Sequence, residues 1–470
     1  MKRHLFILSF AILALLWNCG EKDNPEPEPD STPKAPTAIT LSPSSVTADA
    51  DGGAFDITVK SPFAPTVEGK PDWIDVSSVN LEDYTFTVTV AVKENREYES
   101  REATLSFTAT GATSATLKVS QAAAEQPEPA EETDASLTNA KASQQAVKVY
   151  NYLREQAGKK MLSGVQSGGT ANNNDRVNQV FTMTGKHPAV AGYDYIFLQY
   201  SPTPAGWDWV VNYGDISAAK EQWENNGLVS FMWHWNVPAS KDAWDKGKEG
   251  DFSGYAFYSK DTSFDIKRAL VKGNWENDFI LRDIEKVAGY LKLLQEEGIP
   301  VIWRPLHEAA GNYNVYGTNG AWFWWGRGGA DACKQLWKLL RNKLEGEYGL
   351  DNLIWVWTLD ATVGAEKDYA SWYPGNDLVD LVGVDIYEEN TNAKARQYQA
   401  AVNLSAGHKL VTVSECGNIP DPSKCLAGGE TWNWFLAWDL ESYSLNTENY
   451  WKTLMSSSSV ITREQMPSLK

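Results

Sequence analysis

Beyond residue 135, short apolar segments typical of β-strands alternate with stretches of helical periodicity. The clearest helical stretch carries Ile284, Val287, Leu291 and Leu294 on one face, with Gly298 beyond its end. Eight strands interleaved with helices predict an α/β fold, a closed (β/α)8 barrel over residues 136–470. An open doubly wound sheet is the alternative, but no glycine-rich phosphate turn follows an early strand. The predicted strands are 161–166, 188–193, 228–233, 301–306, 352–358, 378–386, 409–414 and 433–438.

A second pattern precedes the barrel. Residues 37–123 alternate apolar and polar side chains with period two, as in 84–90 and 115–119, and turn residues such as 51–53 separate the runs. Six or seven short strands in so few residues predict a small immunoglobulin-like β-sandwich. Its single tryptophan, Trp73, is expected in the core rather than on a binding surface.

Two acidic, proline-rich segments flank this sandwich. Residues 19–36 form a predicted tether and residues 124–135 a predicted linker, because neither holds apolar residues that could seed a core. Together they carry eight of the net 19 negative charges. The overall negative charge makes a nucleic-acid partner unexpected, since phosphate binding needs clustered cations.

The N-terminus has the pattern of an export signal. Lys2 and Arg3 precede an apolar run over 5–17, too short to cross a bilayer as a helix. Cys19 follows directly, and the acidic stretch 20–23 resembles the surface-export signal of Bacteroidetes lipoproteins. We therefore expect a signal peptide over residues 1–18 and a lipid anchor on Cys19, which places the protein on the outer membrane. An ordinary cleaved signal with an incidental cysteine is the alternative, and whether the anchored protein faces the cell surface or the periplasm stays open.

The remaining cysteines are Cys333, Cys416 and Cys425. The last two are close enough in sequence to form a short-loop disulfide, and buried thiols are the equal alternative. No cysteine and histidine spacing matches a zinc site, and the pair His307-Glu308 lacks the second histidine of a metalloprotease helix. The sequence therefore predicts neither a metal nor a cofactor.

Polar residues follow the predicted strands at the end of a barrel where active sites lie. Two glutamates leave apolar strands abruptly, Glu308 after the fourth strand and Glu415 after the seventh. Glycoside hydrolysis uses such a pair, with one carboxyl group protonated and the other ionised. The alternative is a structural salt bridge with a barrel residue such as Arg304. The full set of strand-end residues is Asp194, His234, His307, Glu308, Asp360, Asp385, Tyr387, Glu415 and Trp438.

Several motifs resemble known families. The segments 304–308 (RPLHE), 322–326 (WFWWG), 385–387 (DIY) and 414–415 (SE) resemble glycoside hydrolase family 26, over roughly residues 140–460. Trp73-Ile74, the stretch 95–101 (NREYESR) and the closing 119–121 (VSQ) resemble the BACON domain of Bacteroidetes carbohydrate-active enzymes. The first resemblance implies an endo-β-1,4-mannanase on a (β/α)8 barrel, and the second implies either a glycan-binding module or a spacer.

The resemblance to family 26 implies roles for individual residues. Glu308 is the implied general acid/base and Glu415 the implied nucleophile of a retaining mechanism. His307 is expected to contact the sugar at subsite −1, where the C2 hydroxyl of mannose is axial, and His234 is expected in the same subsite. Tyr387 should donate a hydrogen bond to Glu415 and hold it as a carboxylate.

Two tryptophans and an aspartate complete the implied binding residues. Trp322 would form a platform at subsite +1, Trp438 the floor of subsite −1, and Asp194 belongs with the substrate-binding residues. The sequence departs from the family twice. Residues 309–321 are a long insertion on the leaving-group side, and Asp439 stands where some members carry an arginine that binds the −2 sugar.

These features predict a monomeric, surface-anchored retaining endo-β-1,4-mannanase that cleaves mannan, glucomannan or galactomannan. Within the same family, an exo-acting mannobiohydrolase or another β-glycanase is the main alternative. A non-catalytic glycan-binding lipoprotein on a decayed enzyme fold is a third possibility, and it would predict the loss of at least one of the two glutamates.

Overall fold

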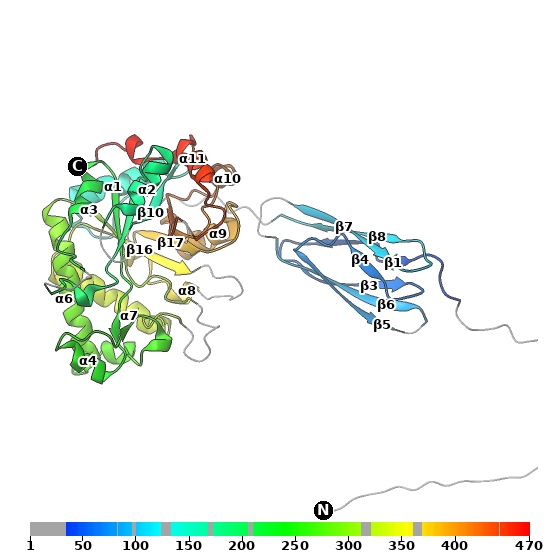
Figure 1. Cartoon of the computed structure of the whole chain (residues 1–470), viewed down its shortest axis with the longest axis horizontal. Coiled ribbons are helices and arrows are strands. Elements are labelled where there is room, and N and C mark those ends of the chain that lie inside the picture. Colours follow the sequence, from blue (N-terminus) through cyan, green and yellow to red (C-terminus); the bar gives the residue numbers. More distant parts are fainter. Residues whose placement is uncertain are drawn as a thin grey trace, which may run out of the picture. The chain divides into compact units, whose positions relative to one another are not determined.

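The computed structural model describes residues 34–81, 83–95, 100–123, 133–167, 173–204, 210–311, 321–360, 369–440 and 442–470. The predicted signal, Cys19 and most of the first tether lie outside these residues. The described chain forms two compact units, one built on an N-terminal pair of sheets and the other on a barrel (Figure 1). Within the described residues, no helix combines the length and apolar character needed to span a bilayer.

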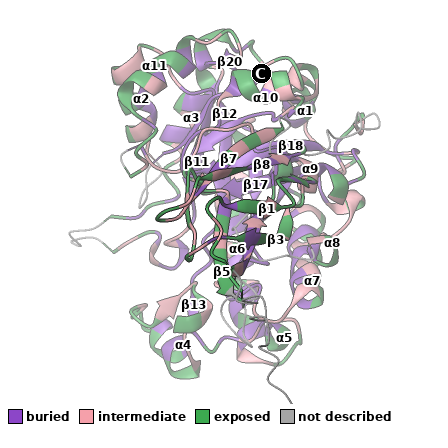
Figure 2. Cartoon of the chain, turned by 90° about the vertical axis from the view of Figure 1, so that its right-hand side faces the viewer, coloured by how far each residue is buried: buried purple, intermediate pink, exposed green. Residues whose placement is uncertain are grey.

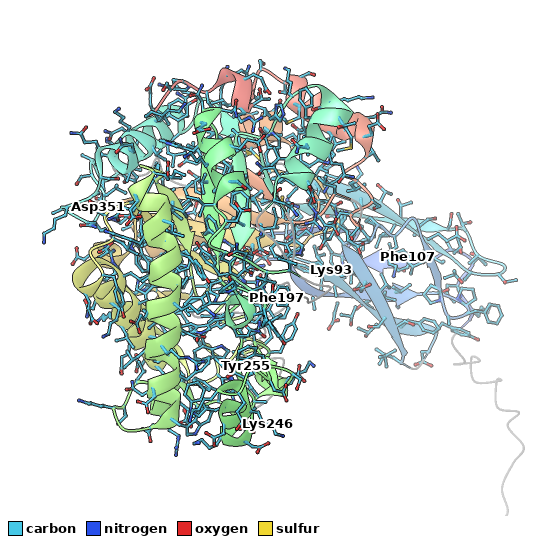
Figure 3. The ribbon with its side chains drawn as sticks, turned by 60° about the vertical axis from the view of Figure 1, so that its left-hand side comes forward. Lys93, Phe107, Phe197, Lys246, Tyr255 and Asp351 are labelled. Carbon is cyan, nitrogen blue, oxygen red and sulfur yellow. The ribbon has the colours of Figure 1, made fainter. Side chains whose placement is uncertain are left out.

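The N-terminal unit is a β-sandwich of two four-stranded sheets. Alternating apolar residues face inward from both sheets, and Phe107, labelled in Figure 3, is fully buried among them. Trp73 is only half-buried, so the expectation that it lies in the core is wrong. One sheet has the order β1 (Thr40–Ser42), β3 (Gly53–Lys60), β6 (Thr85–Val92) and β5 (Ile74–Asn80), and the other β2 (Ser45–Ala48), β8 (Ala115–Gln121), β7 (Arg101–Thr108) and β4 (Thr66–Glu68).

The described sandwich therefore has eight strands rather than six or seven. Two of them, β1 and β2, lie within residues 40–48, where the chain pairs as β1 in one sheet and then passes to the other sheet as β2. This polar stretch is interrupted by Pro43, so it has no continuous period-two alternation that could mark the two strands.

The second unit is the predicted barrel. Its eight parallel strands close on themselves, with Val165 of the first strand paired to Ala437 of the last, which excludes the open sheet. The strands are buried along their length, while the outer faces of the helices are exposed (Figure 2). In barrel order the strands are β10 (Gly164–Gln166), β11 (Val190–Asp194), β12 (Leu228–Met232), β15 (Val301–Arg304), β16 (Leu353–Asp360), β17 (Leu381–Ile386), β18 (Leu410–Cys416) and β19 (Phe435–Ala437).

Helices cover the outside of the barrel. The longest, α6 (Trp275–Glu296), runs along one side (Figure 3) and buries the predicted face from Ile284 to Leu294, and Gly298 has a φ of +65° just past its end. The other α-helices are α1 (Gln144–Gln156), α2 (Asp175–Thr184), α3 (Ser217–Glu224), α4 (Lys241–Gly247), α5 (Ile266–Ala269), α7 (Ala330–Arg341), α8 (Tyr369–Trp372), α9 (Ala395–Leu404), α10 (Pro422–Gly428) and α11 (Glu448–Ser456).

The first predicted barrel strand is split. Residues 161–162 form β9 (Met161–Leu162), which pairs with the C-terminal β20 (Val460–Ile461), and only residues 164–166 join the barrel as β10. The run 161–166 looks like one strand in the sequence, but its two halves belong to different sheets. A further short pair, β13 (Val237–Pro238) and β14 (Tyr255–Ala256), lies on the loop after β12.

Two neighbouring barrel strands carry an irregular register. Val384 of β17 pairs with Val413 of β18, but the next pair is Asp385 with Glu415, so β18 holds one extra residue, Ser414. This bulge is accommodated at Gly383, where a Cβ atom would collide with the Ser414 hydroxyl.

Candidate active site

The carboxylates predicted at the strand ends meet at the carboxyl end of the barrel. Asp194 ends β11, Asp360 ends β16, and Asp385 and Glu415 lie near the ends of β17 and β18. The strand register pairs Asp360 with Asp385 and Asp385 with Glu415, so these three follow one another around the rim. Glu308 lies on the loop after β15, and all five side chains are buried.

Arg304, the last residue of β15, is the cationic centre of this cluster. One of its amino groups donates to both carboxylate oxygens of Asp385, at 3.2 and 2.9 Å, and the other donates to Oε1 of Glu415. Burial by itself lowers the pKa of Arg304, but Asp385 and Glu415 raise it above the ordinary value, so the guanidinium stays charged. One of the two strand-end glutamates, Glu415, therefore forms the salt bridge with Arg304 that was the alternative prediction.

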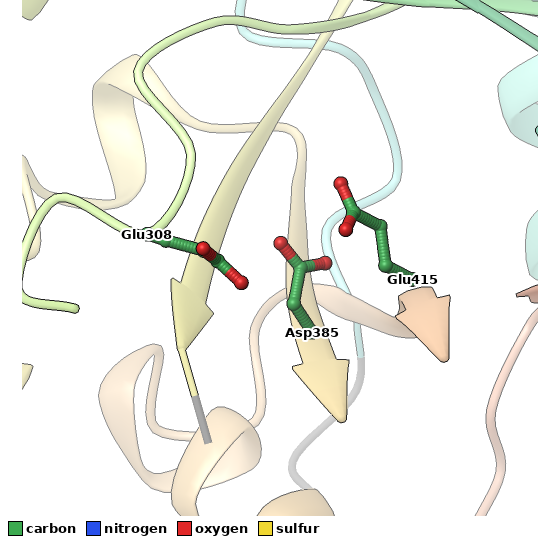
Figure 4. Close-up of side chains that lie close together, drawn as sticks. All are labelled: Glu308, Asp385 and Glu415. Atoms are coloured by element: carbon green, nitrogen blue, oxygen red, sulfur yellow. The ribbon is translucent and has the colours of Figure 1, made fainter. Parts of the chain in front are cut away.

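Glu308 occupies a different environment, although it lies close by. Carboxyl oxygens of Glu308, Asp385 and Glu415 lie within 4.8 Å of one another (Figure 4). Among the described residues, the Glu308 carboxyl group accepts no hydrogen bond from Arg304. Burial raises the pKa of Glu308 well above its usual range, and the negative charges of Asp385, Glu415 and Asp360 raise it further. Burial raises the pKa of Asp385 as well, but Arg304 bonds Asp385 and opposes that rise, whereas it makes no bond to Glu308.

The backbone holds Glu308 in an unusual conformation. Both Leu306 and Glu308 have a φ of +52°, in the left-handed region where a residue other than glycine costs about 1–2 kcal/mol. The Glu308 amide donates to the carbonyl of Thr358 on β16 at 3.2 Å, which fixes the loop against the neighbouring strand. Such strain clusters at functional sites, where the surrounding structure holds it in place.

Tyr387 contacts Glu415 as predicted. Its hydroxyl donates to Oε2 of Glu415 at 2.7 Å, while Arg304 bonds the other oxygen. Both oxygens of Glu415 therefore accept a hydrogen bond, which fixes the orientation of the carboxylate. The Tyr387 ring is 41 % exposed, so it also offers an aromatic face beside the carboxylates.

The two predicted histidines are in contact. The rings of His234 and His307 lie 4.6 Å apart, nearly perpendicular. Asp194 accepts hydrogen bonds from the backbone of His234 at 3.0 Å and pairs with Nδ1 of its ring at 2.6 Å. Burial, together with the charges of His234 and Arg304, lowers the pKa of His307 well below its usual range, so His307 is neutral.

The predicted tryptophan platforms lie at different depths. The Trp438 ring lies 5.8 Å from that of His234, beside the carboxylate cluster, and is half-buried. Trp322 is also half-buried but contacts Phe323, whose ring lies 5.1 Å from that of His307. The amide of Trp322 donates to the carbonyl of Gly311 at 3.1 Å, on the loop that carries Glu308.

The sequence departs from the family pattern at the insertion 309–321 and at Asp439. Of the insertion 309–321, residues 312–320 lie outside the described residues. Asp439 has a basic neighbour, since an amino group of Arg176 on α2 lies 3.7 Å from its carboxylate. The same Arg176 donates to the carbonyl of Trp438 at 2.8 Å, so an arginine from another element supports this side of the site.

The three cysteines of the described residues are buried free thiols. Cys416 and Cys425 do not form a disulfide, which decides between the two alternatives. Cys416 directly follows Glu415, and its thiol lies 3.5 Å from the carbonyl of Leu436.

Glu308, Asp385 and Glu415 are also the one group in the described residues with the geometry of a metal site. Within this group, Arg304 bonds Asp385 and Glu415 and places its positive charge between them.

The sequence does not mark three structural contributors as such. It offers Arg304 only as an alternative salt-bridge partner, and it predicts neither Arg176 nor the bulge at Ser414. A glycine inside an apolar strand, Gly383, is the signal that marks such an irregularity. Arg176 carries no comparable signal, because it lies within a helix rather than at a strand end.

A closed (β/α)8 barrel with adjacent carboxyl groups at the ends of its fourth and seventh strands has the arrangement of a glycoside hydrolase. The model of glycosyl hydrolase family 26 matches residues 138–465, and the chain belongs to this family. The BACON model, an N-terminal binding domain, matches residues 63–122.

Individual relatives agree with this assignment. Mannan endo-1,4-beta-mannosidase A of Piromyces sp is 34 % identical over 71 % of this chain and 51 % of its own, and the enzyme of Thermothelomyces thermophilus is 35 % identical over 72 % and 65 %. The chain thus spans about half the length of the Piromyces relative. The crystal structure of the GH26 domain of a Prevotella bryantii endo-beta-mannanase/endo-beta-glucanase matches 71 % of this chain and 99 % of that domain, with 35 % identity and a TM-score of 0.64. A ruminal GH26 endo-beta-1,4-mannanase structure matches 92 % and 91 %, with 26 % identity and a TM-score of 0.64.

Proposed function

We propose that this protein is a retaining endo-β-1,4-mannanase that cleaves internal bonds of mannan, glucomannan or galactomannan. The observation that carries the reaction type is the pair Glu308 and Glu415. Their carboxyl oxygens lie within 4.8 Å of each other, and of these two side chains Arg304 bonds only Glu415. Retaining enzymes hold their carboxyl groups about 5–5.5 Å apart, and inverting enzymes about 6.5–9.5 Å, to admit a water. The substrate class is supported by the relatives named as mannosidases.

In the first step, Glu415 attacks the anomeric carbon of the sugar at subsite −1. The bond from that carbon to the glycosidic oxygen breaks, and Glu308 gives its proton to the departing oxygen. The product is a glycosyl ester on Glu415, with Glu308 left as a carboxylate. Arg304 and Tyr387 hold Glu415 ionised and oriented before this attack.

In the second step, the ionised Glu308 takes a proton from a water molecule, which attacks the same carbon. The ester bond breaks and Glu415 regains its negative charge, so the sugar leaves with its original configuration. In the intermediate, Glu415 carries no charge. One of the repulsions that raise the pKa of Glu308 is then absent, and the lower pKa suits the change of Glu308 from acid to base.

The remaining residues contact the sugar in this proposal. Neutral His307 can both donate and accept a hydrogen bond, which suits the axial C2 hydroxyl at subsite −1. His234, oriented by Asp194, lies beside it. Trp438 provides the aromatic floor of this subsite, and Trp322 the platform for the sugar at subsite +1.

A product time course on linear mannan and galactomannan tests the proposal. Oligosaccharides of mixed length should appear early, and Glu415→Ala should abolish them, while Asp331→Ala, which changes an exposed carboxylate, should not. Mannobiose as the sole early product would replace endo action with exo action. Binding of mannan without any hydrolysis would identify a non-catalytic glycan-binding protein.

For location, we propose that the mature chain is anchored to the outer membrane by acylation of Cys19 and faces the cell surface. The basic start, apolar run, cysteine and acidic residues of the N-terminus support this reading. Metabolic labelling with a fatty-acid analogue should mark the wild-type chain and not Cys19→Ser. Protease added to intact cells should remove the protein if it faces outward and spare it if it faces the periplasm.

A further inference from the structure

One end of the sandwich carries exposed apolar side chains that the proposed reaction does not use. Phe63 is 61 % exposed, Val79 62 %, Leu81 51 % and Tyr84 38 %. These are all of the large exposed apolar side chains in the described part of the sandwich. We call this group the apolar tip.

The four residues lie on neighbouring segments. The backbone amide of Ser61 donates to the carbonyl of Tyr84 at 2.9 Å, which joins the turn holding Phe63 to the turn between β5 and β6. Val79 lies near the end of the edge strand β5, and Leu81 directly follows that strand before the second turn. The apolar tip is therefore a single patch formed by two adjacent turns.

The second turn is built in a strained conformation. Asp83 and Tyr84 have φ values of +55° and +59°, where turns between strands normally place glycine or asparagine. Aspartate tolerates this conformation in turns, so Tyr84 is the disfavoured residue of the two. The strained turn places Tyr84 at the exposed end of the hairpin.

The chain enters the sandwich at the same end. Thr40, the first residue of β1, pairs with Lys60, and Lys60 pairs with Thr85 directly after the strained turn. The chain leaves at the opposite end, where the amide of Asn95 and the side chain of Gln121 both donate to the carbonyl of Ala50. Figure 1 shows these two ends of the strands.

Chain length links the apolar tip to the proposed anchor. Cys19 lies 21 residues before Thr40, a span of at most about 70 Å when fully extended. A membrane that holds Cys19 is thus within reach of the end of the sandwich that carries the apolar tip, and the tether keeps the two at a high effective concentration.

We propose that the apolar tip docks on the lipid surface in which the chain is anchored. This inference rests on the proposed acylation of Cys19. Val79 and Leu81 are aliphatic and offer neither the flat face nor the hydrogen bonds that a sugar ring needs, whereas Phe63 and Tyr84 are side chains suited to the boundary between headgroups and acyl chains. Docking would turn the end where β8 leaves the sandwich away from the lipid.

Site-specific fluorescence tests the proposal on the full chain, extracted from membranes in detergent and reconstituted into vesicles of phosphatidylethanolamine and phosphatidylglycerol. The native thiols of the described residues are buried, so a polarity-sensitive dye selects an introduced cysteine. Ala64→Cys places the dye beside Phe63 without removing any residue of the apolar tip, and Asp51→Cys places it at the opposite end as the matched control.

The dye at position 64 should shift to the blue and be quenched several-fold more by spin-labelled lipid than the dye at position 51. Replacing Phe63, Val79 and Tyr84 with serine should remove this difference while the chain stays bound to the vesicles. Equal quenching at both positions of a bound chain would overturn the docking proposal. A chain that does not bind vesicles and carries no acyl group would instead overturn the anchor, and a blue shift caused by manno-oligosaccharides without vesicles would identify a glycan site.

Discussion

The substitution Tyr387→Phe removes one defined interaction from the proposed nucleophile. The hydroxyl of Tyr387 donates to Oε2 of Glu415 at 2.7 Å, and the ring remains in the phenylalanine variant. In the glycosyl intermediate, Glu415 is an uncharged ester, and it regains its charge only as the second step proceeds. The hydrogen bond from Tyr387 therefore stabilises most strongly the transition state of the second step, in which the carboxylate of Glu415 leaves the sugar.

The magnitude follows from the charge of the acceptor. A hydrogen bond to a charged group contributes about 1.5–3 kcal/mol, and each 1.36 kcal/mol changes a rate tenfold. If this energy is lost mainly in the transition state of the second step, that step slows about 10- to 150-fold. The first step changes less, because there Glu415 loses its charge.

Pre-steady-state kinetics with an aryl β-mannobioside that has a good leaving group measures the two steps separately. Tyr387→Phe should show a burst of released phenol, a lower kcat, a lower KM and a glycosyl ester on Glu415 detectable by mass spectrometry. Tyr443→Phe is the matched control, since its ring lies 5.9 Å from that of Tyr387 and the structure gives it no bond to the nucleophile. An unchanged kcat, or a rise in KM alone, would refute the reasoning, because it would show that the hydroxyl acts only in substrate binding.

Three further changes test the electrostatics of the barrel. Glu308→Ala should abolish hydrolysis of mannan but preserve the first step on a dinitrophenyl glycoside, whose leaving group needs no proton. Azide should then restore turnover and give a glycosyl azide of retained configuration. A product of inverted configuration would contradict the mechanism. Asp360→Asn removes a negative charge that raises the pKa of Glu308, so the alkaline limb of the kcat/KM profile should move to lower pH, whereas Asp331→Asn should leave it in place. Lys394→Met removes the buried ammonium that lies 3.0 Å from the carboxylate of Glu388 and leaves that carboxylate with the side-chain amides of Asn390 and Gln397. Urea unfolding should show a loss of about 3 kcal/mol, and a loss below about 1 kcal/mol would mean that the amides and solvent compensate the charge of Glu388.

The barrel and its two glutamates could be predicted because each depends on local sequence. Apolar strands alternate with helical stretches, and Glu308 and Glu415 follow strands whose carboxyl ends must converge once the sheet closes. The contact from Tyr387 to Glu415 was expected from the resemblance, and the structure confirms it.

Other features depend on pairing between segments distant in sequence. The run 161–166 divides between two sheets because its first half meets β20, about 300 residues away. Trp73 lies half-exposed because burial in a small sandwich depends on which strand covers it, and alternation does not specify that. Arg176 reaches the carbonyl of Trp438 from a helix whose position only the closed barrel determines.

The extra residue in β18 ties one position of the neighbouring strand to it. The register resumes at Asp385 and Glu415, so Ser414 is absorbed locally and the two carboxylates stay opposite each other. A Cβ atom at position 383 would collide with the Ser414 hydroxyl, so a relative that keeps the extra residue is bound to glycine at this position. The glycine and the extra serine therefore form one unit of inheritance, although they lie about 30 residues apart in the chain.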